Sequence, residues 1–324
     1  MIIVTGGAGF IGSAFVWKLN EEGVDDILIV DNLGTSDKWK NLVALKYSDY
    51  IPKDRFSDMI TSDRIPLDVT AVVHMGACSS TVERDAGYLM ENNYRYSRKL
   101  AEWSLRRDIR FIYASSAATY GDGTQGFFDD NETSLTLRPI NMYGYSKQLF
   151  DLWVLHNRLD LRFTGIKFFN VFGPNEYHKG DMRSVVHKAY GQIQRTGAVE
   201  LFKSHKPGYA DGEQKRDFVY VKDCVEVLWW LLDRPETTGI FNLGTGRARS
   251  WNDLIRAVFS AMKQEPAVRY VDMPEQIREQ YQYYTEASME KLKAAGYERP
   301  FHSLEEAVSD YVVEYLARGE RCLE

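Results

Sequence analysis

The sequence predicts an α/β fold: a doubly wound parallel sheet with a smaller α/β lobe formed mainly by the C-terminal part of the chain. Two observations carry this prediction. Short β-branched runs alternate with amphipathic helical patterns through the first half of the chain, which is typical of parallel sheets. A glycine-rich turn at residues 6–12 joins the first such run to the first helical pattern. The length of 324 residues is sufficient for two lobes.

The composition is typical of a soluble globular protein, with 44% hydrophobic and 27% charged residues. A net charge of −6 provides no basic surface for nucleic acid. No apolar run approaches the ~20 residues of a membrane span, and the first strand begins too early for a signal peptide. The three cysteines have neither CxxC nor metal-ligand spacing, so we expect no metal site and a reduced, cytoplasmic protein.

The first elements predict a dinucleotide site. A strand is expected at residues 2–5, and a second buried strand at residues 27–30 ends in Asp31. Between them, glycines at every third residue open a helix, and their missing β-carbons let the backbone approach a pyrophosphate. Asp31 follows about 20 residues later, where an acid accepts a bond from an adenosine ribose hydroxyl. This is the pattern of a Rossmann fold, and its glycines are Gly6, Gly9 and Gly12.

The choice between NAD and NADP stays open at this point. Asp31 alone favours NAD, because a carboxylate repels the 2′-phosphate of NADP. Lys38 and Lys53 lie in the loop and helix region just beyond, and either can neutralise that phosphate. Both lysines are equally well explained as solvated surface charges.

Further strands of the sheet are expected at residues 71–74, 111–114, 163–168 and 239–243. Small residues after His74 allow the backbone to lie against a cofactor, and His74 itself is interpreted as a strand-end residue. A helix expected at residues 86–107 carries Asn92, which holds a loop or the cofactor or else faces solvent, because asparagine is costly inside a helix. Hydroxyl groups at residues 115–121 lie at the carboxyl edge, where α/β sheets bind ligands.

A polar loop is expected at residues 122–138, followed by a helix that begins at Tyr143 and has Asn141 as its N-cap. Tyr143 and Lys147 lie four residues apart and share one helix face. The lysine charge and the helix dipole both favour a phenolate, so we expect the pKa of Tyr143 to fall and the residue to act as an acid or base. Taken alone, the pair is equally explained by an ordinary amphipathic face.

The second lobe is predicted where the strand–helix alternation loosens. The predicted dinucleotide-binding domain is residues 1–172 plus about 217–246, and the substrate-binding lobe is about 173–216 plus 247–324. In these later segments, helices are expected near 182–196, 222–232, 250–262, 286–294 and 303–318, and strands at 199–202 and 217–221. Arg216 is expected in a Gly/Lys-rich loop at residues 203–216. Its guanidinium either binds a phosphate in bidentate fashion or forms a surface ion pair with Asp217 or a neighbouring residue.

Several motifs together resemble the extended short-chain dehydrogenase/reductase superfamily over nearly the whole chain. The glycine turn at 3–13 and Tyr-Gly-Tyr-Ser-Lys at 143–147 mark the superfamily. More specific motifs resemble its ADP-glyceromanno-heptose 6-epimerases, above all Gly-Ala-Cys-Ser-Ser at 76–80, Ser-Ser-Ala-Ala-Thr-Tyr-Gly at 115–121 and His-Lys-Gly at 178–180. Supporting motifs are Phe-Asn-Val-Phe-Gly-Pro at 169–174, Arg-Asp-Phe-Val-Tyr-Val at 216–221 and Phe-Asn-Leu-Gly-Thr-Gly at 241–246.

The resemblance implies an isomerase that converts ADP-D-glycero-D-manno-heptose to ADP-L-glycero-D-manno-heptose, a precursor of the lipopolysaccharide core. In the family, a tightly bound NADP, one per subunit, takes hydride from carbon 6 and returns it to the other face of a transient ketone, with NAD as the alternative cofactor. Proton transfer on two faces calls for two bases, which the resemblance assigns to Tyr143 and Lys179. It assigns Ser116 to the reacting oxygen and Lys147 to the nicotinamide ribose.

The resemblance also implies binding residues and a homo-oligomer, specifically a homopentamer. Asp181 stands where the family usually has serine, Lys188 where it usually has histidine, and the loop at 205–215 is longer than usual. Besides the three glycines, the implied cofactor contacts are Phe10, Ile11, Asp31, Asn32, Lys38, Lys53, Met75, Gly76, Ala77, Cys78, Ser79, Asn92, Lys147, Val171 and Lys179. The implied substrate contacts are Ser116, Asn170, Asp181, Lys188, Phe202, Lys203, Ser204, His205, Arg216 and Tyr281.

Three other functions are weighed against this one. A UDP-hexose 4-epimerase shares the Tyr-x-x-x-Lys machinery but is not expected to carry the His-Lys-Gly motif at 178–180. A nucleotide-sugar 4,6-dehydratase needs an acid pair after the paired serines, where this chain has Thr-Tyr-Gly at 119–121. A non-catalytic NADP-sensing protein of the same fold usually loses the tyrosine or the lysine, and both are present here.

Overall fold

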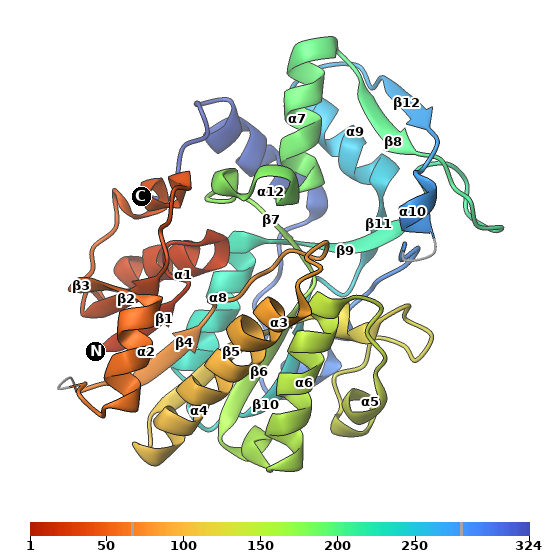
Figure 1. Ribbon diagram of the computed structural model, residues 1–324. Coiled ribbons are helices and arrows are strands. Elements are labelled where there is room, and N and C mark those ends of the chain that lie inside the picture. The colour runs from red at the N-terminus through yellow and green to blue at the C-terminus, as the bar shows by residue number, and fades with distance from the viewer. Residues whose placement is uncertain (66–67, 279–280) are drawn as a thin grey trace.

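A seven-stranded sheet forms the centre of the computed structural model, which describes residues 1–65, 68–278 and 281–324. All its strands are parallel, in the order β10-β6-β5-β4-β1-β2-β3 (Figure 1). The order runs outward from β1 in both directions, which confirms the predicted doubly wound sheet. The strands are β1 (Ile2–Thr5), β2 (Ile27–Asp31), β3 (Asp49–Pro52), β4 (Ala71–His74), β5 (Arg110–Ser116), β6 (Phe163–Phe168) and β10 (Gly239–Leu243).

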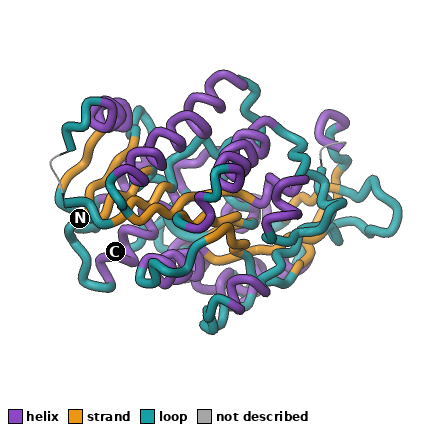
Figure 2. Tube along the Cα trace, turned by 90° about the horizontal axis from the view of Figure 1, so that it is seen from below, coloured by secondary structure: helices purple, strands orange, loops and turns teal. Residues whose placement is uncertain are grey.

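Helices cover both faces of this sheet (Figure 2). One face carries α1 (Phe10–Glu21) and α8 (Val221–Leu232), and the other carries α2 (Lys53–Thr61), α4 (Tyr96–Arg106) and α6 (Met142–His156). The connecting segments contain the 3₁₀ helices η1 (Asp37–Leu42), η3 (Ala117–Tyr120) and η4 (Leu159–Leu161), the helices α3 (Ala86–Leu89) and α5 (Asn131–Thr136), and the π-helix η2 (Met90–Arg95).

Successive residues of each strand point to opposite faces, so the sheet has two separate cores. Ile3 of β1 and Phe111 of β5 belong to the core beneath α2, α4 and α6. Val4 and Ile112, one residue further along each strand, belong to the core beneath α1 and α8. Burial on both faces is the reason that these strands are continuous apolar runs in the sequence.

A second group of elements lies beyond the carboxyl ends of the strands, at the upper right of Figure 1. Its three-stranded sheet has the order β11-β9-β7, and β12 pairs with β8. These strands are β7 (Asn170–Phe172), β8 (Val199–Phe202), β9 (Lys215–Tyr220), β11 (Ala248–Ser250) and β12 (Val268–Val271). The helices in this part of the chain are η5 (Tyr177–Met182, 3₁₀), α7 (Val185–Thr196), α9 (Trp251–Ala261), α10 (Glu275–Arg278), α11 (Glu290–Ala294), α12 (Leu304–Asp310) and η6 (Tyr311–Leu316, a π-helix).

Several local predictions are wrong. β9 begins at Lys215, so Arg216 lies on a strand and not in a loop. The expected loop at residues 122–138 contains α5, which Asp130 caps. The expected helix at residues 86–107 is interrupted by the π-helix η2. β3 had no counterpart in the prediction, because Asp49–Pro52 is not an apolar run like the other strands of the sheet and only Ile51 is buried.

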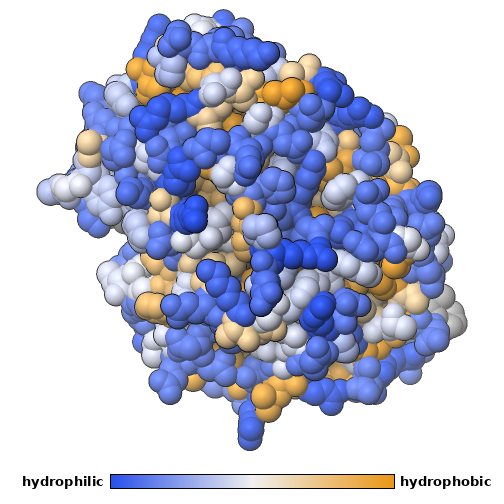
Figure 3. Space-filling model, turned by 180° about the vertical axis from the view of Figure 1, so that it is seen from behind, coloured by the Kyte–Doolittle hydropathy of each residue, from blue (hydrophilic) through white to orange (hydrophobic). Residues whose placement is uncertain are grey.

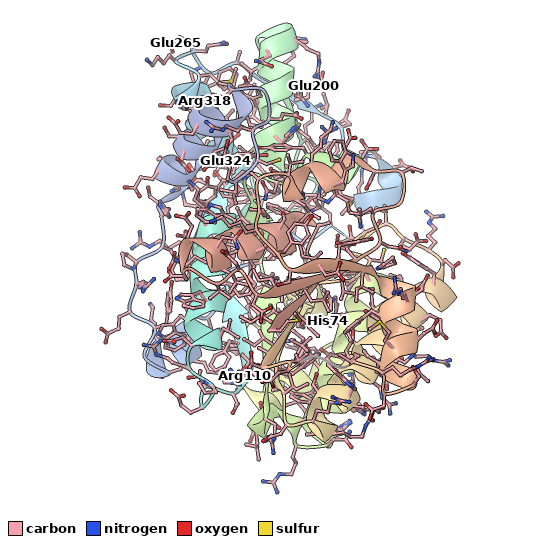
Figure 4. All side chains as sticks on the ribbon, turned by 90° about the vertical axis from the view of Figure 1, so that its left-hand side faces the viewer. His74, Arg110, Glu200, Glu265, Arg318 and Glu324 are labelled. Carbon is pink, nitrogen blue, oxygen red and sulfur yellow. The ribbon has the colours of Figure 1, made fainter. Side chains whose placement is uncertain are left out.

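His74 ends β4, which confirms its interpretation as a strand-end residue. Its ring lies in the interior of the molecule (Figure 4), with Nδ1 2.6 Å from Thr5 Oγ1 and Nε2 2.8 Å from Ser97 Oγ. Burial, and then the charge of Lys147, lowers the pKa of His74 to about 3. The ring is therefore neutral and joins β1 to α4 through one donor and one acceptor nitrogen.

The rear surface of the molecule is mostly hydrophilic, and its apolar side chains form small, separate patches (Figure 3). Across the described ranges of the chain, no helix has both the length and the apolar character that crossing a bilayer requires.

Candidate active site

A cleft of about 490 Å³ lies at the carboxyl edge of the main sheet. The ends of β5 and β6 and the first turns of α1 and α6 contribute side chains to it, and so do η5, β9 and α9. This is the edge at which α/β sheets bind ligands. The predicted site residues that line the cleft are Phe10, Ile11, Ser79, Ser116, Tyr143, Asn170, Val171, Lys179, Arg216 and Tyr281.

Ser116 ends β5 and Tyr143 lies in the first turn of α6, and the Ser116 hydroxyl lies near enough to the phenol to affect its pKa. The helix starts here because Asn141 Oδ1 accepts a bond from the amide of Gly144 at 2.7 Å, which confirms the predicted N-cap. Gly144 is needed because a β-carbon would lie 2.5 Å from the carbonyl oxygen of Ala118. The cap and the glycine together hold the start of α6 against the end of β5.

The predicted fall in the pKa of Tyr143 is wrong. Burial raises the pKa of the Tyr143 phenol, and the nearby Ser116 hydroxyl only partly offsets this effect. The Lys147 ammonium donates instead to the carbonyl oxygen of Ala114 at 2.8 Å. Burial also lowers the pKa of Lys147 to about 8. The four-residue spacing thus places Lys147 against β5, but it does not by itself stabilise a phenolate.

A buried ion pair lies behind the Ser116–Tyr143 pair. Asp151, two turns along α6 from Tyr143, accepts bonds from Ser115 Oγ and Lys167 Nζ, both at 2.6 Å, and from Tyr113 Oη at 3.0 Å. Asp151 and Lys167 are both fully buried. Loss of either partner would leave an uncompensated buried charge. The pair therefore fixes α6 to β5 and β6.

The glycine turn fits the phosphates of a dinucleotide. Gly6 has a φ of +67°, and a β-carbon there would lie 2.6 Å from the backbone of Gly76. A β-carbon on Gly12 would lie 2.1 Å from the carbonyl oxygen of Gly6. Gly9 is the N-cap residue of α1 but provides no side-chain cap, so the first N–H groups of the helix are open to an anion. The backbone therefore has the close-packed, uncapped form that a bound pyrophosphate requires.

Four predicted cofactor residues form two pairs near the ends of β2 and β3. Asp31 Oδ1 accepts a bond from Lys38 Nζ at 2.6 Å, and Lys53 Nζ donates to Asn92 Oδ1 at 2.8 Å. Asn32, the next residue after Asp31, is exposed. Lys38 therefore neutralises the carboxylate that would repel a 2′-phosphate. Lys53 lies 3.9 Å from the carboxylate of Asp54, whose exposure to solvent makes this ion pair a weak one.

Asn93, which the sequence analysis did not select, holds the predicted cofactor segment Met75–Ser79. Its side chain accepts from the Cys78 amide at 2.8 Å and donates to the Cys78 carbonyl oxygen at 3.0 Å. It also donates to Ser146 Oγ at 3.0 Å, on α6. Asn92 was predicted in its place, although Asn93 is the buried residue of η2 and its burial could have marked it.

Lys179 enters the cleft from η5. Its Nζ atom lies 5.1 Å from the centre of the Phe10 ring, at the start of α1. Burial lowers the pKa of Lys179, and the Glu176 carboxylate partly offsets this effect. A lowered pKa enlarges the neutral fraction that can accept a proton. The turn also contains Gly180, whose φ of +54° and ψ of −125° suit glycine.

Arg216 is buried and held at a fixed position in the cleft. Its guanidinium donates to the carbonyl oxygen of Gln282 and lies 5.3 Å from the Tyr281 ring and 5.8 Å from the Trp251 ring. The alternative of a surface ion pair with Asp217 is wrong, because Asp217 accepts bonds from the loop after β10. Gln282 and Trp251 also line the cleft and carried no recognisable sequence signal.

Other predicted substrate residues are not among those that line the cleft. Asp181 and Lys188 are exposed, and Lys188 Nζ donates to the Asp181 carbonyl oxygen at 2.6 Å. Lys203 forms an ion pair of 3.3 Å with Asp272. The backbone amides of Ser204 and His205 bond to Asp211 and Tyr283. Contact of the substrate with these positions, and with Phe202, stays a prediction.

Known proteins similar to this chain share its whole length. The NAD dependent epimerase/dehydratase family model matches residues 2–244. A relative named ADP-L-glycero-D-manno-heptose-6-epimerase, from Nitratidesulfovibrio vulgaris (strain DP4), is 62% identical over 321 residues, covering 99% of both chains. A relative of the same name from Fusobacterium nucleatum subsp. nucleatum is 49% identical over 332 residues, covering 100% of both chains.

Solved structures show the same architecture. The ADP-L-glycero-D-manno-heptose-6-epimerase of Helicobacter pylori is 27% identical with a TM-score of 0.82, covering 97% of this chain and 95% of that one. A UDP-glucose 4-epimerase of Thermus thermophilus, solved with NAD, is 26% identical with a TM-score of 0.76, covering 96% and 97%. These similarities confirm the resemblance inferred from the motifs. The chain belongs to the NAD dependent epimerase/dehydratase family.

Proposed function

We propose that the protein converts ADP-D-glycero-D-manno-heptose to ADP-L-glycero-D-manno-heptose by inversion at carbon 6. The supporting observation is that Ser116, Tyr143 and Lys179 line one cleft from three separate elements. Inversion through a ketone moves the same hydroxyl proton on two faces of the sugar, so it needs two acid–base groups. A phenol and an amine with a lowered pKa in one cleft meet that need.

The residues of the chain divide this work. Tyr143 transfers the proton of the sugar hydroxyl on one face, and Ser116, which lines the same cleft, holds the reacting oxygen. Lys179 Nζ transfers the proton on the other face. Lys147 orients the nicotinamide ribose from its position beside β5. A bound nicotinamide cofactor supplies the acceptor and donor of hydride, which no protein side chain can replace.

Sequence relatives favour an ADP-heptose over a UDP-hexose. The two solved structures do not separate these substrates, since their identities to this chain are 27% and 26%. The full-length relatives at 62% and 49% identity both carry the ADP-heptose name. Arg216 suits the diphosphate of either substrate, because a guanidinium fixed by backbone and aromatic neighbours binds phosphate oxygens in a defined orientation. A UDP-hexose 4-epimerase is therefore the second candidate.

Incubation with each nucleotide sugar separates the candidates. We expect ADP-D-glycero-D-manno-heptose to reach an equilibrium mixture of two epimers and UDP-galactose to remain unchanged. Turnover of UDP-galactose alone would establish the second candidate, and turnover of neither would favour a non-catalytic NADP-sensing role. In heavy water we expect no deuterium at carbon 6, because hydride stays on the cofactor. Substantial incorporation there would indicate carbanion chemistry instead.

NADP is the proposed cofactor, tightly bound with one molecule per subunit. The Lys38–Asp31 pair removes the negative charge that opposes a 2′-phosphate, and Lys53 offers a further positive charge. Denaturation of the purified protein and identification of the released nucleotide tests this choice. Release of NAD would show that Asp31 still binds the ribose hydroxyl as it does in NAD-dependent proteins.

The division of the chain and its assembly are also proposals. Residues 1–172 with about 217–246 would bind the cofactor, and the remainder would bind the sugar nucleotide. The family resemblance supports a homopentamer. Light scattering of the purified protein distinguishes a pentamer from smaller assemblies.

A further inference from the structure

A short 3₁₀ helix, η1, connects the glycine turn to the turn that carries Lys179. Its Asn41 is 3% exposed, and the Nδ2 atom lies 3.0 Å from the carbonyl oxygens of both Ala8 and Asn175. The same atom lies 3.3 Å from Nδ1 of His178. Ala8 belongs to the glycine turn, and His178 precedes Lys179. One side-chain amide therefore contacts both the cofactor turn and the turn that carries the second acid–base residue.

η1 is also attached to the glycine turn through Asp31. The Ala8 amide donates to Asp31 Oδ2 at 2.9 Å, and Lys38 of η1 donates to Oδ1 of the same carboxylate at 2.6 Å. The Asn41 amide and the Asp31 carboxylate thus hold Ala8 from its carbonyl and its amide side. The position of η1 is consequently fixed by the glycine turn.

The segment that leads into η5, the turn that carries Lys179, is held in place at Asn175. Asn175 has a φ of +76°, a conformation that asparagine tolerates better than most side chains. It donates to Ser13 Oγ and accepts from the Leu323 amide, both at 2.9 Å. Leu323 belongs to the C-terminal segment, whose last residue, Glu324, is labelled in Figure 4. Trp17 Nε1, on α1, donates to the carbonyl oxygen of Glu324 at 3.2 Å.

A second anchor follows at Glu176, whose buried carboxylate accepts from the amide and hydroxyl of Ser184, both at 2.6 Å. Lys179 lies between Glu176 and Ser184 in the short turn η5, next to Gly180. Within that turn, the bond between His178 and Asn41 links the residue preceding Lys179 to the glycine turn.

The protonation of His178 suits this bond. Burial, and then the charges of Lys179 and Lys38, lowers the pKa of His178 to about 4, so the ring is neutral near pH 7. In the tautomer that carries its proton on Nε2, Nδ1 accepts from Asn41. The two N–H groups of the Asn41 amide are shared among three acceptors: the carbonyl oxygens of Ala8 and Asn175, and Nδ1 of His178. Removal of this donor would leave two buried carbonyl oxygens with one partner fewer.

We propose that Asn41 is a positioning residue for Lys179, which it holds at a fixed place relative to the glycine turn and therefore to the bound cofactor. The kinetic part of this inference rests on the proposed epimerase function. The structural part does not, because it concerns only the coupling of two turns in the chain.

Hydrogen–deuterium exchange tests the structural part in NADP-saturated protein. Asn41→Asp changes a single side-chain atom and removes the donor, and Asn41→Leu is a second variant without it. We expect amides of residues 176–184 to exchange about tenfold faster in either variant, since one lost hydrogen bond is worth about 1.4 kcal/mol. Amides of residues 6–14 should exchange within twofold of the unmodified protein, with NADP still bound. Faster exchange in both residues 176–184 and residues 6–14, or in neither segment, would overturn the proposal.

Single-turnover reduction of the bound nicotinamide by each purified epimer tests the kinetic part. Because Lys179 is proposed to serve one face only, we expect Asn41→Asp to slow reduction by one epimer about tenfold and by the other less than twofold. Equal slowing with both epimers would contradict a role through Lys179.

Asn242→Leu is the matched control. Asn242 lies on β10 and is as deeply buried as Asn41. Its side-chain amide donates to the carbonyl oxygens of Phe127 and Ser288 at 2.9 and 3.1 Å. We expect Asn242→Leu to lower the melting temperature and to change the rates of reduction by the two epimers equally. The same asymmetry in this control would mean that general destabilisation causes it, which would overturn the proposal.

Discussion

The two acid–base residues of the cleft are positioned in different ways. Tyr143 lies in the first turn of α6, a helix of 15 residues that is capped by Asn141 and wedged against η3 at Gly144. Lys179 lies in η5, a turn of six residues that is held by side chains from distant parts of the chain. Secondary structure positions the phenol, whereas long-range hydrogen bonds position the amine.

This difference predicts different sensitivities to substitution. A helix of this length packed on a sheet forms and melts cooperatively, so a local change shifts Tyr143 little. A turn held by separate side-chain bonds loses about 1 kcal/mol of restraint with each bond removed. We therefore expect changes remote from the chemistry to reach Lys179 more readily than Tyr143.

The largest expected effect is on the phenol itself. Tyr143→Phe removes the hydroxyl and leaves the helix intact, so we expect turnover to fall about 10³-fold with unchanged folding and cofactor content, as for loss of a general acid–base group. Turnover assays and the nucleotide content of the purified variant check this. Wild-type activity in the variant would remove Tyr143 from the mechanism.

The next largest effect is on stability, at Lys147, which lies on the same helix as Tyr143. Its folded-state pKa of about 8 lies below the ordinary lysine value of 10.5, so the unfolded chain binds more protons between these pH values. The cost of burying the charge is therefore present below about pH 8 and disappears as pH rises towards 10.5. Lys147→Met should remove this pH dependence, which amounts to about 3 kcal/mol.

Denaturant unfolding of both proteins at several pH values measures this effect. The stability of Lys147→Met relative to wild type should be greatest below pH 8 and should decline as pH rises. Lys293→Met, at an exposed position, is the control and should show no such trend. A constant difference between wild type and Lys147→Met across the pH range would show that burial does not lower the pKa of Lys147.

A smaller effect on turnover is expected at Lys179. Lys179→Met keeps a long, unbranched side chain but removes the amine, and we expect an overall loss of turnover of about 10²-fold, at the lower end for acid–base groups. Reduction of the bound cofactor by one epimer should be affected more than by the other. A loss that is equal for both epimers would show that Lys179 does not serve a single face.

The same difference explains what the sequence could predict. The glycine turn, the alternation of strands and helices, and the Asn141 cap are all local patterns, and they correctly predicted the sheet and the start of α6. The expected pKa of Tyr143 was wrong because burial depends on tertiary packing, which the spacing to Lys147 does not contain. Local patterns therefore predicted where Tyr143 lies but not its electrostatic environment.

The Lys179 side was less predictable for a related reason. Asn41 bonds to residues that lie 33, 134 and 137 positions away, and nothing in its own segment marks it. Family resemblance supplied Lys179, but it also implied contacts at exposed positions such as Asp181 and Lys188. Long-range bonds of this kind appear only once the chain is folded.

The smallest expected effect sharpens the comparison at the helix cap. Asn141→Ala removes the bond to the Gly144 amide, and the free energy of unfolding should fall by about 1 kcal/mol. Because α6 is also held by the buried Asp151–Lys167 pair, we expect turnover to change less than threefold, about 0.7 kcal/mol. Asn141→Ser, which keeps a capping oxygen, should restore most of the stability. A large loss of turnover in Asn141→Ala with little loss of stability would show that Tyr143 depends on a single local bond, as Lys179 is proposed to do.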